Sequence, residues 1–375
     1  MTGLLKPVLL TLGLGLMSLP PPLQAADCSR TKLREIPQDP GQKGPWEVGA
    51  RTVMVDDFAV EVWYPAARQA GPGEEQLIYD IREHLPAEDA ILIPDESNPE
   101  QICDCYAGLP IDADHGPYPV VIQVHGTAGF RSASASQAVH WASRGFVVLA
   151  ADHPRIRLKD MMGPFGLIGM ALATQRSDTE EIINTLRSPA GDLAFLRNLI
   201  DTDRIGLTGH SAGGGAIAAL GNEKGVKVLM PMASFGGGSG SEVESVLILA
   251  GTDDGLGNYE RQSSSFGGSD VPRSRFVGLA GAGHLAFTDI CIIGADRGGI
   301  LQIALDHGMD VPAIVNNLGR DGCGDRYLPI EDGFAIINYA STIVLEETLQ
   351  CSPGIAARWD GLQNLPGLED ALEAL

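Results

Sequence analysis

The strongest constraint on the fold is a set of six short apolar segments between residues 118 and 279 of the 375-residue chain. The segments are Tyr118–Val124, Phe146–Ala150, Arg204–Thr208, Val226–Met230, Val246–Ala250 and Arg275–Leu279. Helical patterns separate or follow most of them, over Ala133–Ser143, Ala190–Leu199, Ala212–Leu220 and Phe334–Leu349. Continuous apolar strands that alternate with helices predict an α/β fold, with a mostly parallel central sheet covered by helices on both faces.

Two further strands are expected before this set. Arg51–Val55 and Ala59–Tyr64 are rich in β-branched or aromatic residues and flank a polar turn. The next stretch, residues 68–117, is polar and rich in Pro and Asp, so we expect an insertion fixed by a disulfide. The chain then reads as one domain over residues 27–375, with insertions at about 68–117, 156–178 and 286–332.

The most informative motif lies where the third of the six apolar segments meets a helix. The sequence Gly209-His210-Ser211-Ala212-Gly213 is a G-x-S-x-G pattern in a strand–turn–helix context. Such a turn forces the serine into a strained backbone conformation, and glycines on either side avoid collisions. We therefore predict that Ser211 is a catalytic nucleophile, the alternative being a glycine-rich turn with an idle serine.

A serine nucleophile needs a base and an acid, which in this kind of site follow it in the order acid, then His. Asp253 and Asp254 both follow the strand Val246–Ala250, and we favour Asp254 because G-x-x-D is the usual arrangement. His284 follows the last strand of the set and is the expected base. The remaining aspartate would then cap backbone N–H groups in the turn.

The transition state also needs donors for its oxyanion. One expected donor is the backbone N–H of Ala212, directly after the nucleophile. The second should come from the loop His125–Gly129, where we favour the N–H of Thr127 and keep Ala128 as a reserve. His125 itself is expected to be structural, because it ends a strand.

Three segments together resemble a known family. They are His125-Gly126-Thr127-Ala128-Gly129-Phe130-Arg131, Trp141-Ala142-Ser143-Arg144-Gly145-Phe146-Val147-Val148 and Gly209-His210-Ser211-Ala212-Gly213-Gly214. They resemble the platelet-activating-factor acetylhydrolase and dienelactone-hydrolase-like branch of the α/β-hydrolase superfamily, and bacterial cutinase-like polyesterases are similar over the same segments. The resemblance covers roughly residues 47–285. It implies an α/β-hydrolase fold, ester hydrolysis without a cofactor, and the triad and oxyanion donors assigned above.

The sequence also departs from this branch. Dienelactone hydrolases proper usually have a cysteine nucleophile, whereas this chain has Ser211. Polyesterases usually carry an aromatic clamp after the strand at Val226–Met230, where Phe235 is the candidate here. Phe130 is a second candidate substrate contact, and residues 286–332 have no counterpart and are a candidate flap beside His284. Residues 161–172 are either a lid or acyl-binding wall, or an ordinary core helix with a loop, and surface docking to lipid is a third alternative.

Charge and targeting signals limit the partners and the location. The net charge of −22 and the lack of a Lys/Arg cluster argue against nucleic acid as a partner. Residues 1–26 have the pattern of a signal peptide, with Lys6, an apolar run too short to span a bilayer, and a small-residue end. We therefore expect a secreted or periplasmic monomer without a membrane span.

The six cysteines are expected to form disulfides, because an even number in an exported chain is typical of them. Their pairing cannot be derived from the sequence. A metal site is the alternative, but Cys103-Asp104-Cys105 lacks the spacing of a zinc site, so we expect no metal.

The functional hypothesis is an exported serine esterase of short or medium acyl esters, with lipids or polyesters as further candidate substrates. One alternative is acyl transfer or amide hydrolysis at the same site. The other is a non-catalytic binding protein on a hydrolase fold, against which the complete set of Ser211, Asp254 and His284 argues.

Overall fold

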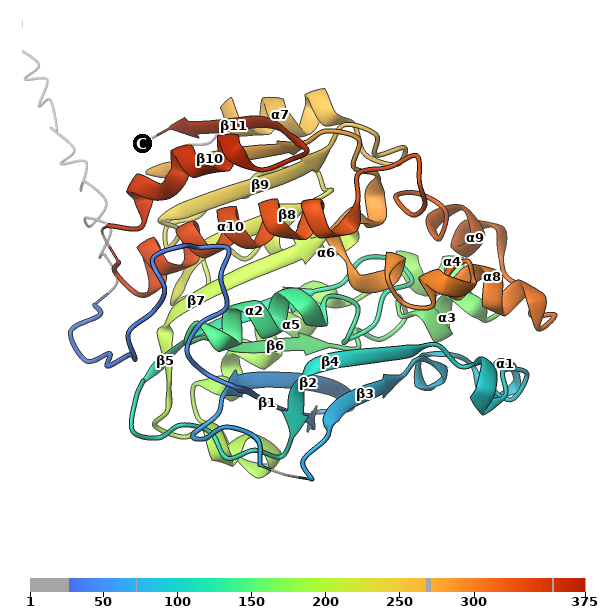
Figure 1. The fold of residues 1–375 in the computed structure, drawn as a ribbon, viewed down its shortest axis with the longest axis horizontal. Coiled ribbons are helices and arrows are strands. Elements are labelled where there is room, and N and C mark those ends of the chain that lie inside the picture. Colours follow the sequence, from blue (N-terminus) through green and yellow to red (C-terminus); the bar gives the residue numbers. More distant parts are fainter. Residues whose placement is uncertain (1–26, 72, 268–270, 353, 375) are drawn as a thin grey trace, which may run out of the picture.

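An eleven-stranded mixed sheet forms the centre of the molecule (Figure 1). The computed structural model describes residues 27–71, 73–267, 271–352 and 354–374, so the expected signal peptide lies outside the described residues. The strands are β1 (Val48–Val55), β2 (Phe58–Pro65), β3 (Gln76–Asp80), β4 (Glu100–Ala107), β5 (Tyr118–Val124), β6 (Val147–Ala151), β7 (Ile200–His210), β8 (Val226–Met232), β9 (Ser245–Gly251), β10 (Arg273–Leu279) and β11 (Leu368–Ala374). Their order across the sheet is β11-β10-β9-β8-β7-β5-β6-β2-β1-β4-β3.

The predicted parallel core is present. Strands β6, β5, β7, β8, β9 and β10 are neighbours and all run parallel. The chain passes from β5 outward to β6 and then returns to the other side of β5 to form β7. The connections after β5 and β7 therefore leave the sheet in opposite directions, which opens a crevice at the carboxyl ends of these two strands.

Helices cover both faces of the sheet, as expected. The α-helices are α1 (Ala87–Ala90), α2 (Ala135–Ser143), α3 (Leu158–Met162), α4 (Gly166–Ala171), α5 (Gln175–Leu186), α6 (Ala212–Ala218), α7 (Tyr259–Gly267), α8 (Gly299–Asp306), α9 (Ala313–Leu318) and α10 (Ile330–Leu349). Helices α2 and α10 cross the near face in Figure 1, and their side chains join one buried cluster with Met230 and Leu249. Alternate residues of the same strands, such as Ile248, point into a second cluster that includes Ile182 of α5 and Ile217 of α6.

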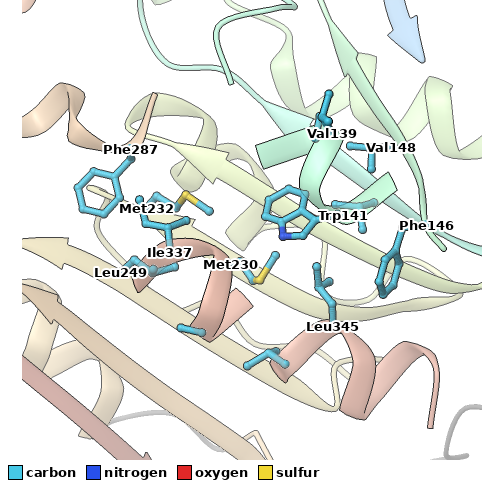
Figure 2. Close-up of a cluster of buried hydrophobic side chains, with 14 of the residues drawn as sticks. Val139, Trp141, Phe146, Val148, Met230, Met232, Leu249, Phe287, Ile337 and Leu345 are labelled. Atoms are coloured by element: carbon cyan, nitrogen blue, oxygen red, sulfur yellow. The ribbon is translucent and has the colours of Figure 1, made fainter. Parts of the chain in front are cut away.

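The first cluster packs α2 and α10 against each other and against the sheet. Trp141 is fully buried between the two helices, with Met230 and Leu345 nearby (Figure 2). Its indole N–H donates to the hydroxyl of Ser341 at 2.9 Å, so its one polar atom is satisfied. This packing holds the two helices against one face of the sheet.

Several elements differ from the sequence-based expectation. Ala190–Leu199 was expected to be an α-helix, but it holds only a 3₁₀ helix over Gly191–Leu196, because Gly191 has a positive φ and the chain turns into β7. Helix α5, in the segment that follows β6, was missed. Residues 68–117 also contribute β3 and β4 to the sheet edge, beyond the polar insertion that was expected.

Three disulfides are present: Cys28–Cys351, Cys103–Cys105 and Cys291–Cys323. The expectation that a disulfide ties down residues 68–117 is wrong, because Cys103 and Cys105 pair with each other within β4. Their side chains share one face of the strand and are buried against α2. Within the described ranges, no group of three or more His, Cys, Asp or Glu side chains could hold a metal ion, and no helix has the length and apolar character needed to cross a membrane.

Candidate active site

Ser211 lies in the turn between β7 and α6, with φ 54° and ψ −120°. This strained conformation depends on the flanking glycines. A Cβ on Gly209 would lie 2.4 Å from the carbonyl oxygen of Gly213, and a Cβ on Gly213 would lie 2.1 Å from that of Val124. The sequence G-x-S-x-G thus folds into a sharp elbow that presents the serine at the carboxyl end of the strand, at the first turn of a helix.

Asp254 and His284 form a buried pair beside this elbow. The Nδ1 atom of His284 lies 3.0 Å and 3.1 Å from the two carboxylate oxygens of Asp254. Because Nδ1 donates to a carboxylate, Nε2 carries the lone pair, and it has no hydrogen-bond partner in the part of the chain that the structure describes. The imidazole is therefore oriented to accept a proton at Nε2.

The His284 side chain and two backbone N–H groups hold the Asp254 carboxylate in its ionised form. Burial raises its pKa, but the hydrogen bond from His284 and those from the N–H groups of Gly257 and Leu256 outweigh burial and leave the pKa below its ordinary value. The N–H of Leu256 lies 3.0 Å and that of Gly257 lies 2.6 Å from Oδ1. Asp253, the alternative acid, is exposed and accepts a hydrogen bond from the hydroxyl of Thr252 instead.

His210 connects the elbow to the His284 loop. Its Nε2 donates to the carbonyl oxygen of His284 at 2.9 Å, and the two rings lie 4.8 Å apart. Burial and the neighbouring His284 lower the pKa of His210 to about 3, so the ring stays neutral. The side chain before the nucleophile therefore fixes the backbone that carries the expected base.

The loop after β5, His125–Gly129, is the candidate oxyanion loop, and it brings Thr127 close to the elbow that carries Ala212. A Cβ on Gly126 would lie 2.8 Å from the Cβ of Ser211, so the loop lies directly against the elbow. Among the described residues, the N–H groups of Thr127 and Ala212 have no hydrogen-bond acceptor. The N–H of Ala128, the reserve donor, is already bonded to the carbonyl oxygen of Ile156 at 2.9 Å.

His125 holds this loop through the hydrogen bonds of its ring. Its Nε2 accepts the backbone N–H of His153 at 3.1 Å, so Nδ1 carries the proton and donates to the carbonyl oxygen of Gly126 at 2.8 Å. Burial and the nearby His153 lower the pKa of His125 to about 3. A Cβ on Gly129 would lie 2.8 Å from the His125 ring, so the loop wraps tightly around it.

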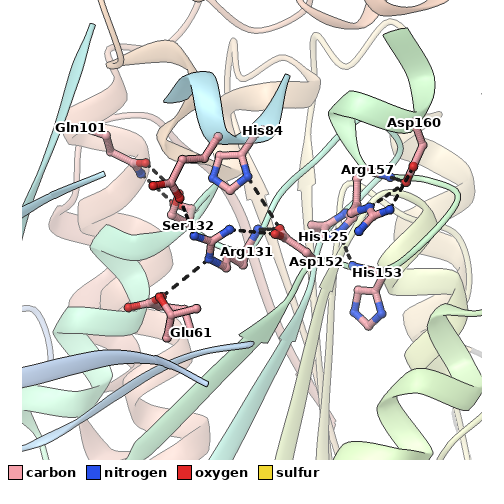
Figure 3. A network of polar contacts seen from close by, with 12 residues as sticks. Glu61, His84, Gln101, His125, Arg131, Ser132, Asp152, His153, Arg157 and Asp160 are labelled. Carbon is pink, nitrogen blue, oxygen red and sulfur yellow. Dashed lines mark hydrogen bonds and ion pairs between the residues drawn. The ribbon is translucent and has the colours of Figure 1, made fainter. Parts of the chain in front are cut away.

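A buried ionic network continues from the same loop (Figure 3). Arg131 binds both oxygens of Asp152, through its backbone N–H and its guanidinium, each at 2.8 Å. Glu61 extends this network and lies 3.7 Å from the guanidinium of Arg131. The ring of His84 lies 3.8 Å from Asp152, and burial lowers the pKa of His84 to about 4. The segment after β5 is thereby fixed to the end of β6, which holds the candidate oxyanion loop in place.

Asp321, which the sequence analysis missed, links the acid turn to the histidine loop. Its Oδ1 accepts the backbone N–H of His284 at 3.1 Å, and its Oδ2 accepts that of Gly255 at 2.9 Å. Glycine is required at the contact, because a Cβ on Gly283 would lie 2.7 Å from Oδ1. No sequence signal identifies Asp321, since it lies 37 residues after His284 and contacts both loops through their backbone N–H groups.

We expect Asp321→Ala to lower kcat for ester hydrolysis by about tenfold with little change in KM, because it loosens both loops without touching the substrate site. Asp325→Ala, at an exposed carboxylate nearby, is the matched control. Steady-state kinetics on p-nitrophenyl acetate measure both constants. Unchanged kcat in Asp321→Ala would show that the two loops hold their positions without the carboxylate.

The two candidate substrate contacts have different surroundings. Phe130 is buried, stacks on His84 at 4.4 Å, and lines an apolar cavity beside the oxyanion loop. Phe235 is exposed, with the guanidinium of Arg261 4.5 Å from its ring centre. The segment 161–172 forms the end of α3 and all of α4, and Met162 lines the same cavity as Phe130.

Asp289 ties the segment after His284 to the start of α2. Its Oδ2 accepts the N–H of Ser136 at 2.9 Å, and the amide of Gln101 lies 3.3 Å from the same oxygen. Complete burial raises the pKa of Asp289 to about 6, against the opposing effect of these hydrogen bonds. The folded protein therefore holds a proton on this group at a pH where the unfolded chain has lost it.

This shift predicts a pH-dependent stability. The contribution of Asp289 to the free energy of unfolding is fully present below its ordinary pKa of 3.8. This contribution is lost as the pH rises to about 6, and the total loss is up to about 3 kcal/mol. Asp289→Asn, which is neutral at every pH, should therefore gain stability relative to the wild type between pH 4 and pH 7. Urea unfolding across this range measures the difference, with Asp296→Asn at an exposed site as control. A constant difference would contradict the prediction.

Comparison with known proteins finds a family and a solved structure to which this chain is similar. Residues 33–156 match the family model for platelet-activating factor acetylhydrolase, isoform II. The structure of a ferulic acid esterase from Streptomyces cinnamoneus is similar over 83% of this chain and 92% of that chain, with a TM-score of 0.55 and 18% sequence identity. No curated protein matches the sequence.

The structural match confirms the predicted α/β-hydrolase fold, and the family model confirms the resemblance to the acetylhydrolase branch over residues 33–156. The matched range of the family model includes the oxyanion loop and ends before the elbow of Ser211.

Proposed function

We propose that this α/β-hydrolase is a serine carboxylic ester hydrolase in which Ser211, His284 and Asp254 form the catalytic triad. The observation that carries the proposal is the buried Asp254–His284 pair beside a strained serine elbow. A second support is the pair of N–H groups at Thr127 and Ala212, which bond to none of the residues that the structure describes. No cofactor is needed for this chemistry.

In the proposed mechanism, the hydroxyl of Ser211 attacks the ester carbonyl carbon while Nε2 of His284 takes its proton. The N–H groups of Thr127 and Ala212 stabilise the oxyanion of the tetrahedral intermediate. The protonated imidazole then gives its proton to the leaving alcohol, and an acyl group stays on Ser211. Water, activated by the same imidazole, releases the acid and restores the serine.

Covalent labelling tests the proposal directly. A fluorophosphonate probe should add its mass to the peptide that contains Ser211, and p-nitrophenyl acetate should compete with the labelling. The wild-type protein should also hydrolyse p-nitrophenyl acetate. Absence of both label and turnover in folded protein would reject the enzyme assignment.

We also propose that the protein acts outside the cytoplasm, after removal of residues 1–26. Three disulfides support this location, because such bonds persist in oxidising compartments. Mass spectrometry of the protein recovered outside the producing cell should give the mass of a chain without residues 1–26. Retention of those residues, or of the protein inside the cell, would contradict export.

A further inference from the structure

An apolar cavity lies beside the oxyanion loop, and its walls come from the three segments that the sequence marks as insertions. Ile81 and Ile93 line it from the first segment, and Leu158 and Met162 from the second. Helices α8 and α9, in the third segment, contribute residues such as Ala304. The helices of these segments gather at one end of the molecule, to the right in Figure 1.

These walls are separate from the two sheet cores. Their buried side chains form two smaller hydrophobic clusters of their own, one around Phe130 and Val315 and one around Ile93 and Ile303. Hydrogen bonds join the first and third segments, because Arg297 donates to the carbonyl oxygen of Asn98 at 3.4 Å and the amide of Gln101 lies 3.3 Å from a carboxylate oxygen of Asp289. These two walls are thus fixed to each other.

The cavity reaches the candidate oxyanion loop and the residue after His284. Thr127, whose N–H is a proposed oxyanion donor, lines it, and so does Leu285, which follows His284. Gly126, next to Thr127, lies directly against Ser211. A chain attached to a carbonyl group held at Ser211 therefore has an apolar space within reach.

The side chains that line the cavity determine which kind of ligand it can bind. The described lining residues are mostly aliphatic, and the one charged member is Arg82, whose guanidinium is bonded to Asp80 and Asp95. An anionic group would leave water without finding a free cationic side chain there. An unbranched aliphatic chain loses only contact with water, and Met162 and Met309 can adapt to its shape.

We propose that this cavity binds an unbranched aliphatic chain of the ester substrate. The inference rests on the proposed esterase function and adds a substrate class to it. The chain belongs either to the acyl half or to the alcohol half of the ester, and the two are chemically equivalent for the cavity. The three insertions then select the substrate, while the sheet carries the reactive groups.

Two substrate series test the proposal. p-Nitrophenyl esters from acetate to decanoate vary the acyl chain, and acetate esters from ethyl to octyl alcohol vary the other half. We expect kcat/KM to rise about fourfold for each methylene that enters the cavity, in one of the series, until the cavity is full. The series that rises identifies which half occupies the cavity, and a flat or falling profile in both series would overturn the proposal.

Variants of α8 localise the effect. Ala304→Phe places a ring in the cavity and should lower kcat/KM for the longest good substrate at least tenfold, with the shortest ester changed less than twofold. Leu305→Phe, on the same helix but outside the cavity lining, should change neither. Val315→Ala enlarges the cavity and should shift the preferred length toward longer chains, which misfolding cannot produce.

The outcomes separate this inference from the proposed function. Labelling of Ser211 and turnover of p-nitrophenyl acetate report on the triad alone. If those succeed while Ala304→Phe and Val315→Ala leave the dependence of kcat/KM on chain length unchanged, the aliphatic chain of the substrate binds elsewhere and the cavity assignment is wrong.

Discussion

Replacement of Ser211 by alanine is expected to lower kcat for p-nitrophenyl acetate by about 10⁶-fold. The proposed reaction passes through an acyl group on this oxygen, and removal of the oxygen leaves only binding and the oxyanion donors. The fold should survive, since Ser211 donates its backbone N–H to Met232 at 2.9 Å and this bond does not involve the hydroxyl.

Steady-state rates and fluorophosphonate labelling measure the effect together. Ser239→Ala, in an exposed loop, provides a matched serine control that should retain full activity and label. If Ser211→Ala kept wild-type turnover, another nucleophile would have to do the chemistry, and the assignment of the elbow would fail.

Asp254→Asn is expected to lower kcat by about 10⁴-fold while the protein remains folded. An amide has almost the shape of the carboxylate, but its NH₂ group can face Nδ1 of His284 and favour the wrong tautomer. The imidazole then carries its proton at Nε2 and cannot accept one from the serine. The variant also loses the charge that stabilises the imidazolium formed during the reaction.

The neighbouring aspartate provides the matched control for this prediction. Asp253→Asn removes an exposed carboxylate one residue away and should change kcat less than twofold. Rates for both variants, with circular dichroism to verify folding, test the choice between the two aspartates. A large loss in Asp253→Asn with little loss in Asp254→Asn would reverse the assignment.

The central sheet could be predicted because its strands carry their own signal. Tyr118–Val124 is apolar except for Gln123, and the observed strand β5 has the same bounds. β4 gave no such signal, because Gln101 points inward while Ile102 is 60% exposed, which inverts the usual pattern. The last strand, β11, is acidic and rich in helix-forming residues, and it is extended only because it pairs with β10.

Some residues of the candidate site could likewise be predicted from the sequence, and others could not. Ser211, Asp254 and His284 stand in local motifs at strand ends, so the sequence could indicate them, and the structure brings Asp254 to His284. Asp321 and the pairing of the cysteines depend on contacts between distant segments, for which a single sequence has no local pattern. The cavity could not be predicted either, because its walls meet only in the folded chain.

The link between Cys28 and Cys351 has a consequence for how the molecule survives damage. It closes almost the whole described chain into one covalent ring that contains the other two bridges. A protease that cuts a single exposed loop opens this ring once but sets no piece free. The two cut ends stay attached through the bridge, so the nicked molecule can keep its sheet assembled where an open chain would come apart.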